Sequence, residues 1–590
     1  MKDGFVRCAS ATVDIKVAET DYNTSNIIKA IEDAAQNDIK LIVFPELCIT
    51  GYTCGDLFLQ KILIDSAKDS LIKIAKATEN LDITAVVGLP YVAEQTLYNC
   101  AAVVNGGHIK GLVPKLNIPN YAEFYEARHF TAGKNEVTYV NINGEEVPFG
   151  ANILFKTDAC EDFVLAVEIC EDLWTAMPPS VNHALAGATI IANLSASNEV
   201  IAKDEYREML VKSQSAKLYC GYIYSDAGYG ESTTDLVFAG DNMIAENGTI
   251  LARSKRFNNE CVYTELDLER LVGERKKSNT YNIVGSEKYV CVKLDMNIGD
   301  TKITRYVDKQ PFVPSDDKKR EKRSEEILSI QSLGLKKRLD HTHAKTAVVG
   351  VSGGLDSTLA LLVTVRAFDS LNLDRKNIIA VTMPCFGTTD RTYNNAVNFA
   401  NSLGVTLKEV NIKAAVNQHF ADIEHDPNVY DVTYENSQAR ERTQILMDVA
   451  NKSGGLVIGT GDMSELALGW ATYNGDHMSM YGVNAGVPKT LIRYLVDYEA
   501  KRTNNDILKK TLQDILDTPV SPELLPPKDG KISQKTEHIV GPYELHDFFL
   551  YHLMRFGSKP SKILRLSEVA FEGIYDREVI LEWLKVFYRR

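Results

Sequence analysis

The stretch TAVVGVSGGLDSTLALLVTVRAF, residues 346–368, decides the fold of the second half of the chain. Its β-branched start predicts a strand, SGGLDS (352–357) predicts a glycine turn, and the residues that follow predict a helix. Further strand candidates are IIAVTMP (378–384), TLKEVNI (406–412) and GGLVIGTG (454–461), which are separated by long helical segments. Strands that alternate with helices in this way predict a doubly wound α/β fold with a parallel sheet.

The SGGLDS loop has the composition of an anion-binding turn. Two glycines let backbone N–H groups approach an anion, and the N-terminus of the following helix favours negative charge. Ser352 and Ser357 can donate hydroxyl hydrogen bonds to phosphate oxygens. Asp356 cannot help to bind a bare anion, so it indicates a divalent cation beside the phosphates. The Walker A pattern is absent, and a plain strand-to-helix turn is the alternative interpretation.

The first half of the chain, up to about residue 265, alternates short β-rich runs with helical or loop segments. SNIIKAIEDAAQND (25–38) has a helical apolar period, with Ser25 as the expected N-cap. NGGHI (105–109) and NGTIL (247–251) predict hairpin turns. The seven strand candidates are residues 5–15, 39–47, 83–92, 100–109, 163–170, 188–195 and 221–228. Together these features predict a layered α/β domain with many strands.

Composition bounds the class of protein. With 590 residues, 45% of them hydrophobic and 24% charged, the chain is typical of a globular protein of about two to four domains. The formal net charge of −14 argues against nucleic acid as the main partner, because phosphate contacts need a basic face. A charged, proline-bearing stretch at 298–324 predicts a solvated linker, and a nucleic-acid tag at its basic cluster, 318–323, is the alternative.

The ten cysteines form no CxxC pair and no zinc-like cluster with histidine. Scattered cysteines in a large chain indicate buried thiols in a reducing compartment. The N-terminal residues lack the charged start and long apolar run of a signal peptide, and no apolar stretch approaches the ~20 residues that span a bilayer. We therefore expect a cytoplasmic protein without a membrane partner.

One cysteine has an unusual set of neighbours. VEICEDLW (167–174) puts Cys170 at the end of an apolar strand, with Glu168 before it and Glu171 and Asp172 after it. Carboxylates hold a neighbouring thiol in its neutral form, whereas a nucleophilic cysteine needs a cation or a helix N-terminus to lower its pKa. Cys170 is therefore either a buried structural residue or a nucleophile whose base and cation come from elsewhere in the chain.

Two further motifs can supply those partners. FPELCITGY (44–52) places Glu46 just after an apolar strand, and VPKLNIPNYAEFYEARHF (113–130) places Lys115 near another. Each residue alone is commonly a solvated or structural one. In this order, however, Glu46, Lys115 and Cys170 resemble the Glu-Lys-Cys triad of the nitrilase family.

The resemblance extends beyond the triad. NLSAS (193–197) fits the same family, and ESTTDLVFAGDNMIAENG (231–248) is similar to the glutaminase domain that is fused to NAD synthetase. It implies an α-β-β-α sandwich in which Cys170 attacks the side-chain amide of glutamine, with Glu46 as base and Lys115 stabilising the oxyanion. The residues that it assigns to glutamine binding are Tyr121, Phe124, Glu171, Ser197 and Lys203. Relatives often carry arginine where this chain has Lys203.

The second half resembles the ATP pyrophosphatase enzymes at SGGLDS and NAD synthetase over an ordered set of motifs. These motifs are VTMPCFGTTDRT (381–392), YENSQARERT (434–443), GTGDMSELALGWATYNGD (459–476), NAGVPKTLIRYLV (484–496), SPELLP (521–526) and VGPYELHDFFLYHLMRFGSKPSKI (540–563). The ATP-binding residues that the resemblance implies are Gly350, Val351, Ser352, Gly353, Gly354, Leu355, Asp356, Ser357, Thr460 and Lys489. Those that it implies for nicotinic acid adenine dinucleotide (deamido-NAD) are Asn436, Arg440, Glu465, Trp470, Thr472 and Tyr473, and Asp356 and Glu465 are implied to hold Mg²⁺.

The resemblance to glutamine-dependent NAD synthetases implies a complete reaction. Glutamine hydrolysis through a thioester on Cys170 releases ammonia, and Mg-ATP adenylates deamido-NAD with loss of pyrophosphate; ammonia then displaces AMP to give NAD. We expect a nitrilase-like glutaminase domain over 1–270, a connecting segment and charged linker over 271–324, and an ATP pyrophosphatase domain over 325–590. Another amidotransferase of the same loop class and a non-catalytic homologue are the alternatives.

The family also implies features that no motif displays. Ammonia is expected to pass between the two sites through a tunnel in a homo-oligomer, usually an octamer. Relatives continue past the segment that resembles LEWLKVFYRR (581–590) into a basic, glycine- and proline-bearing tail that contributes a lysine to the substrate site. The sequence stops at Arg590, so either that tail is absent from it or the dinucleotide site closes differently in this protein.

Overall fold

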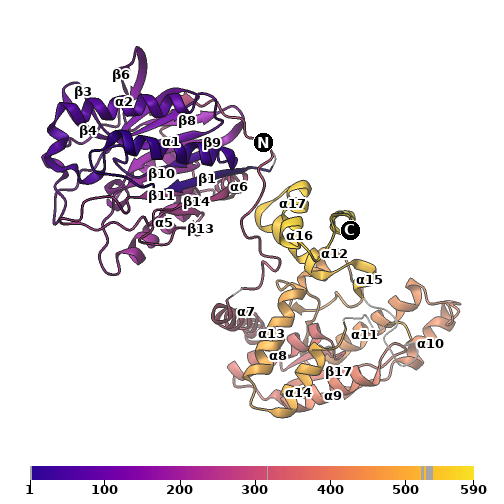
Figure 1. The fold of residues 1–590 in the computed structure, drawn as a ribbon. Helices are drawn as coiled ribbons and strands as arrows, with labels where there is room; N and C mark the ends of the chain where they lie inside the picture. The colour runs from indigo at the N-terminus through magenta and orange to yellow at the C-terminus, as the bar shows by residue number, and fades with distance from the viewer. Residues whose placement is uncertain (1–2, 315, 520–523, 527–535) are drawn as a thin grey trace. The chain divides into compact units, whose positions relative to one another are not determined.

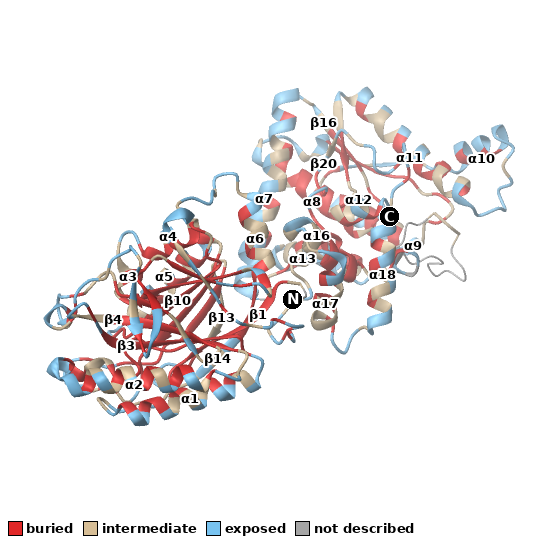
Figure 2. Cartoon of the chain, turned by 90° about the horizontal axis from the view of Figure 1, so that it is seen from above, coloured by how far each residue is buried: buried red, intermediate tan, exposed pale blue. Residues whose placement is uncertain are grey.

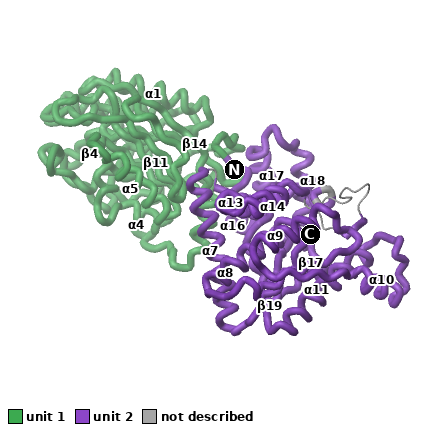
Figure 3. Tube along the Cα trace, turned by 90° about the horizontal axis from the view of Figure 1, so that it is seen from below, with its two compact units in different colours: residues 1–306 green, residues 307–590 purple. Residues whose placement is uncertain are grey.

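The structure is a computed structural model that describes residues 3–314, 316–519, 524–526 and 536–590. It consists of two compact units, residues 1–306 and residues 307–590 (Figure 3). Residues 521–523 of the SPELLP motif lie outside the described residues. Within the described part of the chain, no helix combines the length and the apolar character that a bilayer span requires.

Two sheets form the centre of the first unit. The eight-stranded sheet has the order β14 (Cys261–Asp267), β1 (Phe5–Ala11), β2 (Leu41–Val43), β3 (Thr84–Ala93), β4 (Thr96–Asn105), β5 (His108–Pro114), β7 (Glu145–Phe149) and β6 (Thr138–Ile142). The seven-stranded sheet has the order β13 (Thr249–Arg253), β12 (Met243–Glu246), β11 (Gly221–Asp226), β10 (Ile190–Ser195), β9 (Cys160–Ile169), β8 (Ile153–Thr157) and β15 (Val290–Lys293). All seven predicted strands are present, and both predicted hairpin turns join paired antiparallel strands.

Helices cover the outer face of each sheet. The outer face of the eight-stranded sheet packs on α1 (Thr20–Gln36) and α2 (Lys61–Ala77), and that of the seven-stranded sheet packs on α4 (Pro179–Leu185) and α5 (Lys203–Leu218). Figure 2 shows α1 and α2 along one side of the buried strands and α4 and α5 toward the other. The predicted α-β-β-α sandwich is therefore confirmed.

Side-chain alternation along the strands explains these layers. Val86 on β3 and Val167 on β9 point into the core between the sheets, whereas their neighbours Val87 and Ala166 point to the outer helices. Strands that are apolar on both faces are buried on both sides. This is why the central strands read as continuous apolar runs in the sequence.

The start of α1 differs from the prediction. The helix begins at Thr20, and Ser25 lies inside it, where its hydroxyl donates to the Asp21 carbonyl at 2.8 Å instead of capping the helix. Asn23 is buried in the first turns and donates to the Ile49 carbonyl at 3.1 Å. Tertiary contacts of the first turns therefore extend the helix beyond the start that local capping signals predicted.

Residues 271–306 belong to the first compact unit. In that range β15 pairs with β8 in parallel, and the Thr301 hydroxyl donates to the Phe5 carbonyl at 2.9 Å. Arg305 donates to Glu246 at 2.8 Å. The basic cluster at 318–323, at the end of the stretch expected as a linker, lies in the first turns of helix α7 (Asp317–Thr342), which belongs to the second unit.

The second unit contains a five-stranded parallel sheet, as the sequence predicts. Its order is β18 (Thr406–Glu409), β17 (Ile378–Thr382), β16 (Thr346–Gly350), β19 (Gly455–Gly459) and β20 (Tyr481–Gly482). One face packs on α7, α8 (Leu355–Ser370), α9 (Asp390–Leu403), α13 (Lys489–Arg502) and α14 (Asp506–Leu516), and the other on α10 (Lys413–Asp422) and α11 (Val432–Ser453). Several of these helices are labelled in Figure 1.

The strand order marks where a ligand can bind in this unit. The chain leaves β16 toward β17 on one side and later returns to place β19 on the other side. In doubly wound sheets, ligands bind beyond the carboxyl ends of the strands at such a switch point. The loops after β16 and β19, which carry SGGLDS and GTGDMSE, therefore lie at the expected crevice.

Candidate active sites

The first unit brings the three predicted catalytic residues together. Glu46 follows β2, Lys115 directly follows β5 and Cys170 directly follows β9, so each residue lies just beyond the carboxyl end of a strand. The Lys115 Nζ atom lies 2.6 Å from Glu46 Oε1, and both side chains are fully buried. The charges of Glu46 and Lys115 both act on the pKa of Cys170. The motif at 44–52 supplies Glu46 and Tyr52 to this site, and the motif at 113–130 supplies Lys115 and Glu126.

Glu126 is a further member of this site that the sequence interpretation missed. Its carboxylate oxygens lie 2.7 and 2.9 Å from Lys115 Nζ, and the Tyr52 hydroxyl donates to it at 2.9 Å. Burial raises the pKa of Glu126 to about 7, although Lys115 opposes the shift. Burial alone would lower the pKa of Lys115, but the carboxylates of Glu126 and Glu46 raise it well above its usual range. The available signal was that Glu126 lies in the same motif as Lys115 and Tyr52 in the same motif as Glu46.

Hydrogen bonds hold Glu46 in one orientation. Asn99 donates to Oε1 at 2.6 Å, and the backbone N–H of Ala196 donates to Oε2 at 3.0 Å. Both oxygens of a buried carboxylate are therefore satisfied, as burial requires. This side chain can receive a proton only in competition with those donors and Lys115.

Cys170 occupies a strained backbone position between β9 and the short helix α3 (Glu171–Trp174). Its φ is 44° and its ψ −99°, outside the usual regions for a residue with a side chain, and its N–H donates to the Leu194 carbonyl at 2.9 Å. Burial raises the pKa of the thiol well above its usual range; Glu46 raises it further and Lys115 lowers it. Burial therefore favours the neutral form of the Cys170 thiol.

Asp172 and Glu168, which lie close to Cys170 in sequence, accept hydrogen bonds from backbone N–H groups. Asp172 accepts the backbone N–H groups of Ile169 at 3.0 Å and Asn117 at 2.9 Å, which fixes the turn around the cysteine. Glu168 points toward the outer helices and accepts the N–H of Ser180 at 2.8 Å. The carboxylate with the largest effect on the thiol is Glu46, which is remote in sequence.

The residues predicted to bind glutamine form one cluster beside the cysteine. The Tyr121 hydroxyl lies 3.0 Å from both Glu171 oxygens, and the Lys203 ammonium lies 5.6 Å from the centre of the Phe124 ring. Lys203 also donates to Asn198, the residue next to Ser197. Sequence interpretation missed Asn198, because an amide between two predicted residues carries no pattern of its own.

The loop predicted to bind phosphate lies between β16 and α8. Gly353 has a φ of +83°, and a Cβ atom there would lie 2.2 Å from the Thr392 carbonyl oxygen, so only glycine fits. The N–H of Gly354 donates to the Ser352 hydroxyl at 3.2 Å, and the Ser357 hydroxyl donates to the Gly354 carbonyl at 3.1 Å. The loop therefore ends at the N-terminus of α8 with its two serines side by side.

Three carboxylates meet beside this loop. Asp356, Asp462 and Glu465 each offer an oxygen within 4.8 Å of the other two. Asp462 was not predicted; it is fully buried and caps α12 (Met463–Leu468) by accepting the Glu465 N–H at 2.8 Å. Asp356 Oδ1 is buried without a hydrogen-bond donor among the described residues. Closely spaced carboxylate oxygens with open coordination suit a hard divalent cation.

Lys489 lies within this acidic cluster. Its Nζ atom is 2.7 Å from Asp356, 2.7 Å from Asp462 and 2.9 Å from Glu465. Burial raises the pKa of Glu465 to about 7 and Asp356 adds to the shift, whereas Lys489 opposes it. Asn484, which was also missed, donates to the carbonyls of Asp356 and of Thr460 at 2.9 and 3.1 Å, and so joins the two strand-end loops.

The residues predicted to contact deamido-NAD come from α11, from α12 and from the loop after α12. The Thr472 hydroxyl donates to the Asn436 side chain at 2.9 Å, and Arg440 donates to the Tyr473 carbonyl at 3.2 Å. The Trp470 N–H donates to the Glu465 carbonyl at 2.9 Å, which places this loop next to the acidic cluster. The predicted residues of the second unit are thus contiguous.

Comparisons with known proteins match each of the two units to a family. Residues 327–576 match the NAD synthase family and residues 7–276 match the carbon-nitrogen hydrolase family. The chain is similar to proteins named glutamine-dependent NAD(+) synthetase from Mycobacterium bovis (39% identity over 100% of this chain and 91% of the relative) and Aquifex aeolicus (30%, 94% and 90%). A crystal structure of such a protein from Cytophaga hutchinsonii aligns over 99% of this chain and 92% of that one, with 24% identity and a TM-score of 0.41. Identity of 39% over the full length shows that the chain belongs to the glutamine-dependent NAD(+) synthetase family.

Proposed function

We propose that this protein converts deamido-NAD, ATP and glutamine into NAD, and that the residues described above carry the two half-reactions. The observation that carries the proposal is the buried Glu46–Lys115–Glu126 contact beside Cys170, in a chain that also has the acidic cluster and phosphate loop. Burying a lysine together with two carboxylates costs desolvation free energy. Buried ionisable groups of this kind cluster at functional sites. The position of Lys115 beside a strained cysteine suits amide hydrolysis.

In the first half-reaction, the Cys170 thiol transfers its proton to Glu46 as the sulfur attacks the side-chain amide of glutamine. The raised pKa of the thiol means that this transfer occurs during the attack rather than before it. Lys115 and a backbone N–H near Cys170 stabilise the oxyanion. Ammonia leaves with a proton returned by Glu46, and water, activated by the same carboxylate, hydrolyses the glutamyl thioester to glutamate.

Glutamine itself would be held by the Tyr121–Lys203 cluster. The carboxylate of Glu171 suits the α-ammonium group, and the Lys203 ammonium suits the α-carboxylate as a single point charge. Ser197 can donate its hydroxyl to the same carboxylate. The rings of Tyr121 and Phe124, in an edge contact at 5.9 Å between centroids, would enclose the aliphatic part of the substrate.

In the second half-reaction, the loop from Gly350 to Ser357 would bind the ATP phosphates with its backbone N–H groups and serine hydroxyls. The nicotinate carboxylate of deamido-NAD attacks the α-phosphorus, pyrophosphate leaves, and ammonia then displaces AMP from the mixed anhydride. Asp356, Asp462 and Glu465 would hold Mg²⁺, which supplies charge neutralisation for the phosphates. Lys489 and Thr460 would contact ATP, and the Asn436–Tyr473 surface with Trp470 would hold the dinucleotide.

The remaining expectations belong to the same proposal. Ammonia becomes protonated in water, so it must pass between the sites by a closed route, and a tunnel within a homo-oligomer, an octamer as in the family, would provide one. The cytoplasm is the proposed compartment. All ten cysteines are free thiols, which suits a reducing environment.

The test compares NAD formation with glutamine and with ammonium as the nitrogen donor, in the wild type and in Cys170→Ala. We expect the variant to lose glutamine-driven synthesis and to keep the ammonium-driven rate. Cys160→Ala, at the buried start of the same strand, is the matched control and should keep both activities. A wild type that makes no NAD from either donor would contradict the proposal.

A further inference from the structure

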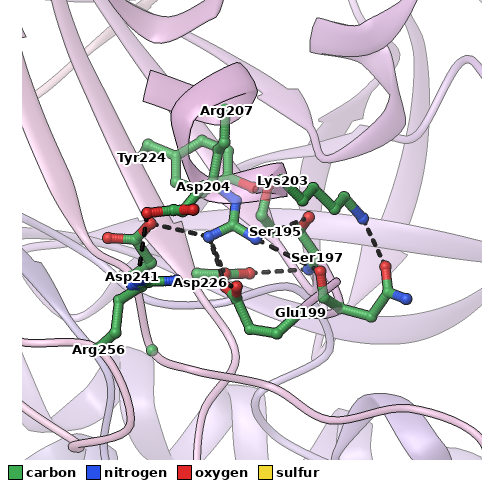
Figure 4. Close-up of polar contacts among 12 residues, drawn as sticks. Ser195, Ser197, Glu199, Lys203, Asp204, Arg207, Tyr224, Asp226, Asp241 and Arg256 are labelled. Atoms are coloured by element: carbon green, nitrogen blue, oxygen red, sulfur yellow. Dashed lines mark hydrogen bonds and ion pairs between the residues drawn. The ribbon is translucent and has the colours of Figure 1, made fainter. Parts of the chain in front are cut away.

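The first turns of α5 run beside the segment that carries Ser197. Lys203 donates to the Asn198 side chain. Arg207, one turn later on the same helix, donates through Nη2 to the Ser197 hydroxyl and to the Asn198 carbonyl, each at 3.4 Å. Figure 4 shows the Arg207 side chain reaching from α5 toward Ser197 and the acids around it. Two cations of one helix thus hold the same short segment.

Arg207 is among the largest side chains that are fully buried in the protein. Three carboxylates surround it: Glu199 at 2.7 Å, Asp241 at 2.8 Å and Asp226 at 3.8 Å from Nη1. The same Asp226 accepts the backbone N–H of Ser197 at 2.8 Å. Ser197 is therefore fixed at both its backbone and its hydroxyl by one buried ion cluster.

The contact with Arg207 also directs the serine proton. A guanidinium can only donate hydrogen bonds, so the Ser197 oxygen accepts from Arg207 and its own hydrogen must point elsewhere. A hydroxyl arranged in this way is a donor suited to a carboxylate oxygen. Arg207 cannot reach the substrate itself, because its side chain has no exposed surface.

We propose that Arg207 is a positioning residue for glutamine, which holds Ser197 and Asn198 so that the Ser197 hydroxyl and the Lys203 ammonium together bind the α-carboxylate of the substrate. The inference rests on the proposed glutaminase function and adds to it a residue that never touches the substrate. It predicts an effect on glutamine affinity rather than on the chemistry at Cys170.

Arg253 offers a matched control within the same ion cluster. It pairs with Asp241 at 2.8 Å and with Glu208 at 2.8 Å, and it is partly exposed. Arg207 donates both to Asp241 and to Ser197, whereas Arg253 is linked to Ser197 through Asp241 and Arg207. Loss of Arg253 removes a charge from the cluster without removing a contact to the glutamine segment.

The experiment measures the KM for glutamine in NAD synthesis together with the rate at which iodoacetamide alkylates Cys170. Iodoacetamide lacks the α-amino and α-carboxylate groups, so it reports the reactivity of the thiol alone. For Arg207→Lys we expect the glutamine KM, and the glutamine concentration that half-protects Cys170 from alkylation, to rise about tenfold, as for loss of one charged hydrogen bond. The kcat at saturating glutamine, the ammonium-driven rate and the alkylation rate without glutamine should stay within about twofold, a change of less than half a kcal/mol.

Ser197→Ala removes the hydroxyl that Arg207 holds and adds no bulk, so it tests the same idea without disturbing the ion cluster. It should raise the glutamine KM by a similar factor, and Arg253→Met should leave the KM unchanged. An unchanged KM in Arg207→Lys or Ser197→Ala, or an equal fall in kcat and alkylation rate in Arg207→Lys, would overturn the inference. Failure of glutamine to protect wild-type Cys170 would instead contradict the proposed glutaminase function.

Discussion

The Lys489 ammonium lies 2.7 Å from the Asp356 carboxylate, which begins the helix after the phosphate loop. Asp462 and Glu465 approach the same nitrogen from the other strand-end loop. Three carboxylates and one ammonium carry a formal charge of −2, which one divalent cation would balance. Lys489 thus ties together two loops whose acids would otherwise repel each other.

Substitution of Lys489 should make the stability of the second unit depend on metal ions. Lys489→Met leaves the buried Asp462 and the partly buried Asp356 and Glu465 without their cation, and breaking a buried ion pair from one side costs about 3–5 kcal/mol. In buffer with chelator we expect a lower Tm than the wild type, and Mg²⁺ should raise the Tm of the variant more than that of the wild type. Differential scanning calorimetry measures both.

Lys501→Met is the control for that experiment, because Lys501 lies on the same helix but is exposed and pairs with Asp497 one turn earlier. It should melt like the wild type in either buffer. An equal response to Mg²⁺ in Lys489→Met and in the wild type would show that the cluster does not bind the metal.

Asp462→Asn should weaken metal binding without removing the helix cap. Asparagine is as good an N-cap as aspartate, so α12 should form, while the cluster loses one anionic oxygen donor. We expect Mn²⁺ affinity, measured by electron paramagnetic resonance with a non-hydrolysable ATP analogue, to fall about tenfold or more. Asp431→Asn, at the exposed N-cap of α11, is the matched control and should bind Mn²⁺ like the wild type. Unchanged affinity in Asp462→Asn would remove this residue from the metal site.

Gly353→Ala should abolish ATP binding and leave the first unit active. A Cβ atom would meet the Thr392 carbonyl at 2.2 Å, so the loop has to move. NAD synthesis should be lost with both glutamine and ammonium, while glutamine protection of Cys170 from alkylation persists. Gly404→Ala shares the positive φ, at +74°, but its Cβ meets nothing within 4 Å, so it isolates the backbone strain of about 1–3 kcal/mol. If both variants bind ATP equally, close approach at the loop is not required.

The stability of the first unit should fall as the pH rises from 5 to 8. Burial raises the pKa of Glu168 to about 7, above the usual value near 4.3. The folded state then binds the proton more tightly than the unfolded chain, so the stabilising contribution is complete below about pH 4.3 and is lost as the pH rises through about 7. Glu126 and Asp226, which also have raised pKa values of about 7, add to the same trend.

Glu168→Gln removes one of these groups while keeping an acceptor for the Ser180 N–H. We expect the difference in unfolding free energy between pH 5.5 and pH 7.5, measured with urea, to shrink by up to about 1.4 kcal/mol per pH unit. Glu161→Gln, at an exposed position on the same strand, should leave the difference unchanged. A pH dependence identical to the wild type in Glu168→Gln would contradict the assignment.

The sequence predicted those features of the sites that depend on residues close together in the chain. Strand patterns predicted that Glu46 and Cys170 follow apolar strands and that Lys115 lies near another, and the resemblance to the nitrilase family grouped the three; each lies just beyond the carboxyl end of a strand. The glycine loop at 352–357 was predictable for the same reason, because a φ of +83° at Gly353 requires glycine. The contacts among Glu46, Lys115 and Cys170 depend on how the two sheets pack, because β2 and β5 belong to the eight-stranded sheet and β9 to the seven-stranded one.

Other site residues could not be found because their roles depend on distant partners. Glu126 and Asp462 look like ordinary acids in their motifs, and only the fold places them against Lys115 and Lys489. Arg207 has no motif at all; its surroundings come from Glu199, Asp226 and Asp241 on three separate segments. Hydrophobic periods of two or 3.6 residues show which face of a strand or helix is apolar. They do not show which buried charged side chains of different elements come into contact.

The pairing of β15 with β8 limits how the hydrolase half can be produced as a separate fragment. A fragment that stops at residue 270 lacks β15, so β8 becomes an open edge whose unpaired N–H and C=O groups can recruit other chains. It also lacks the hydrogen bonds from Thr301 to Phe5 and from Arg305 to Glu246, which attach the end of the 271–306 segment to the rest of the unit. Truncation after Tyr306 keeps β8 paired with β15, and crystallisation or screening with the isolated half should start from that boundary.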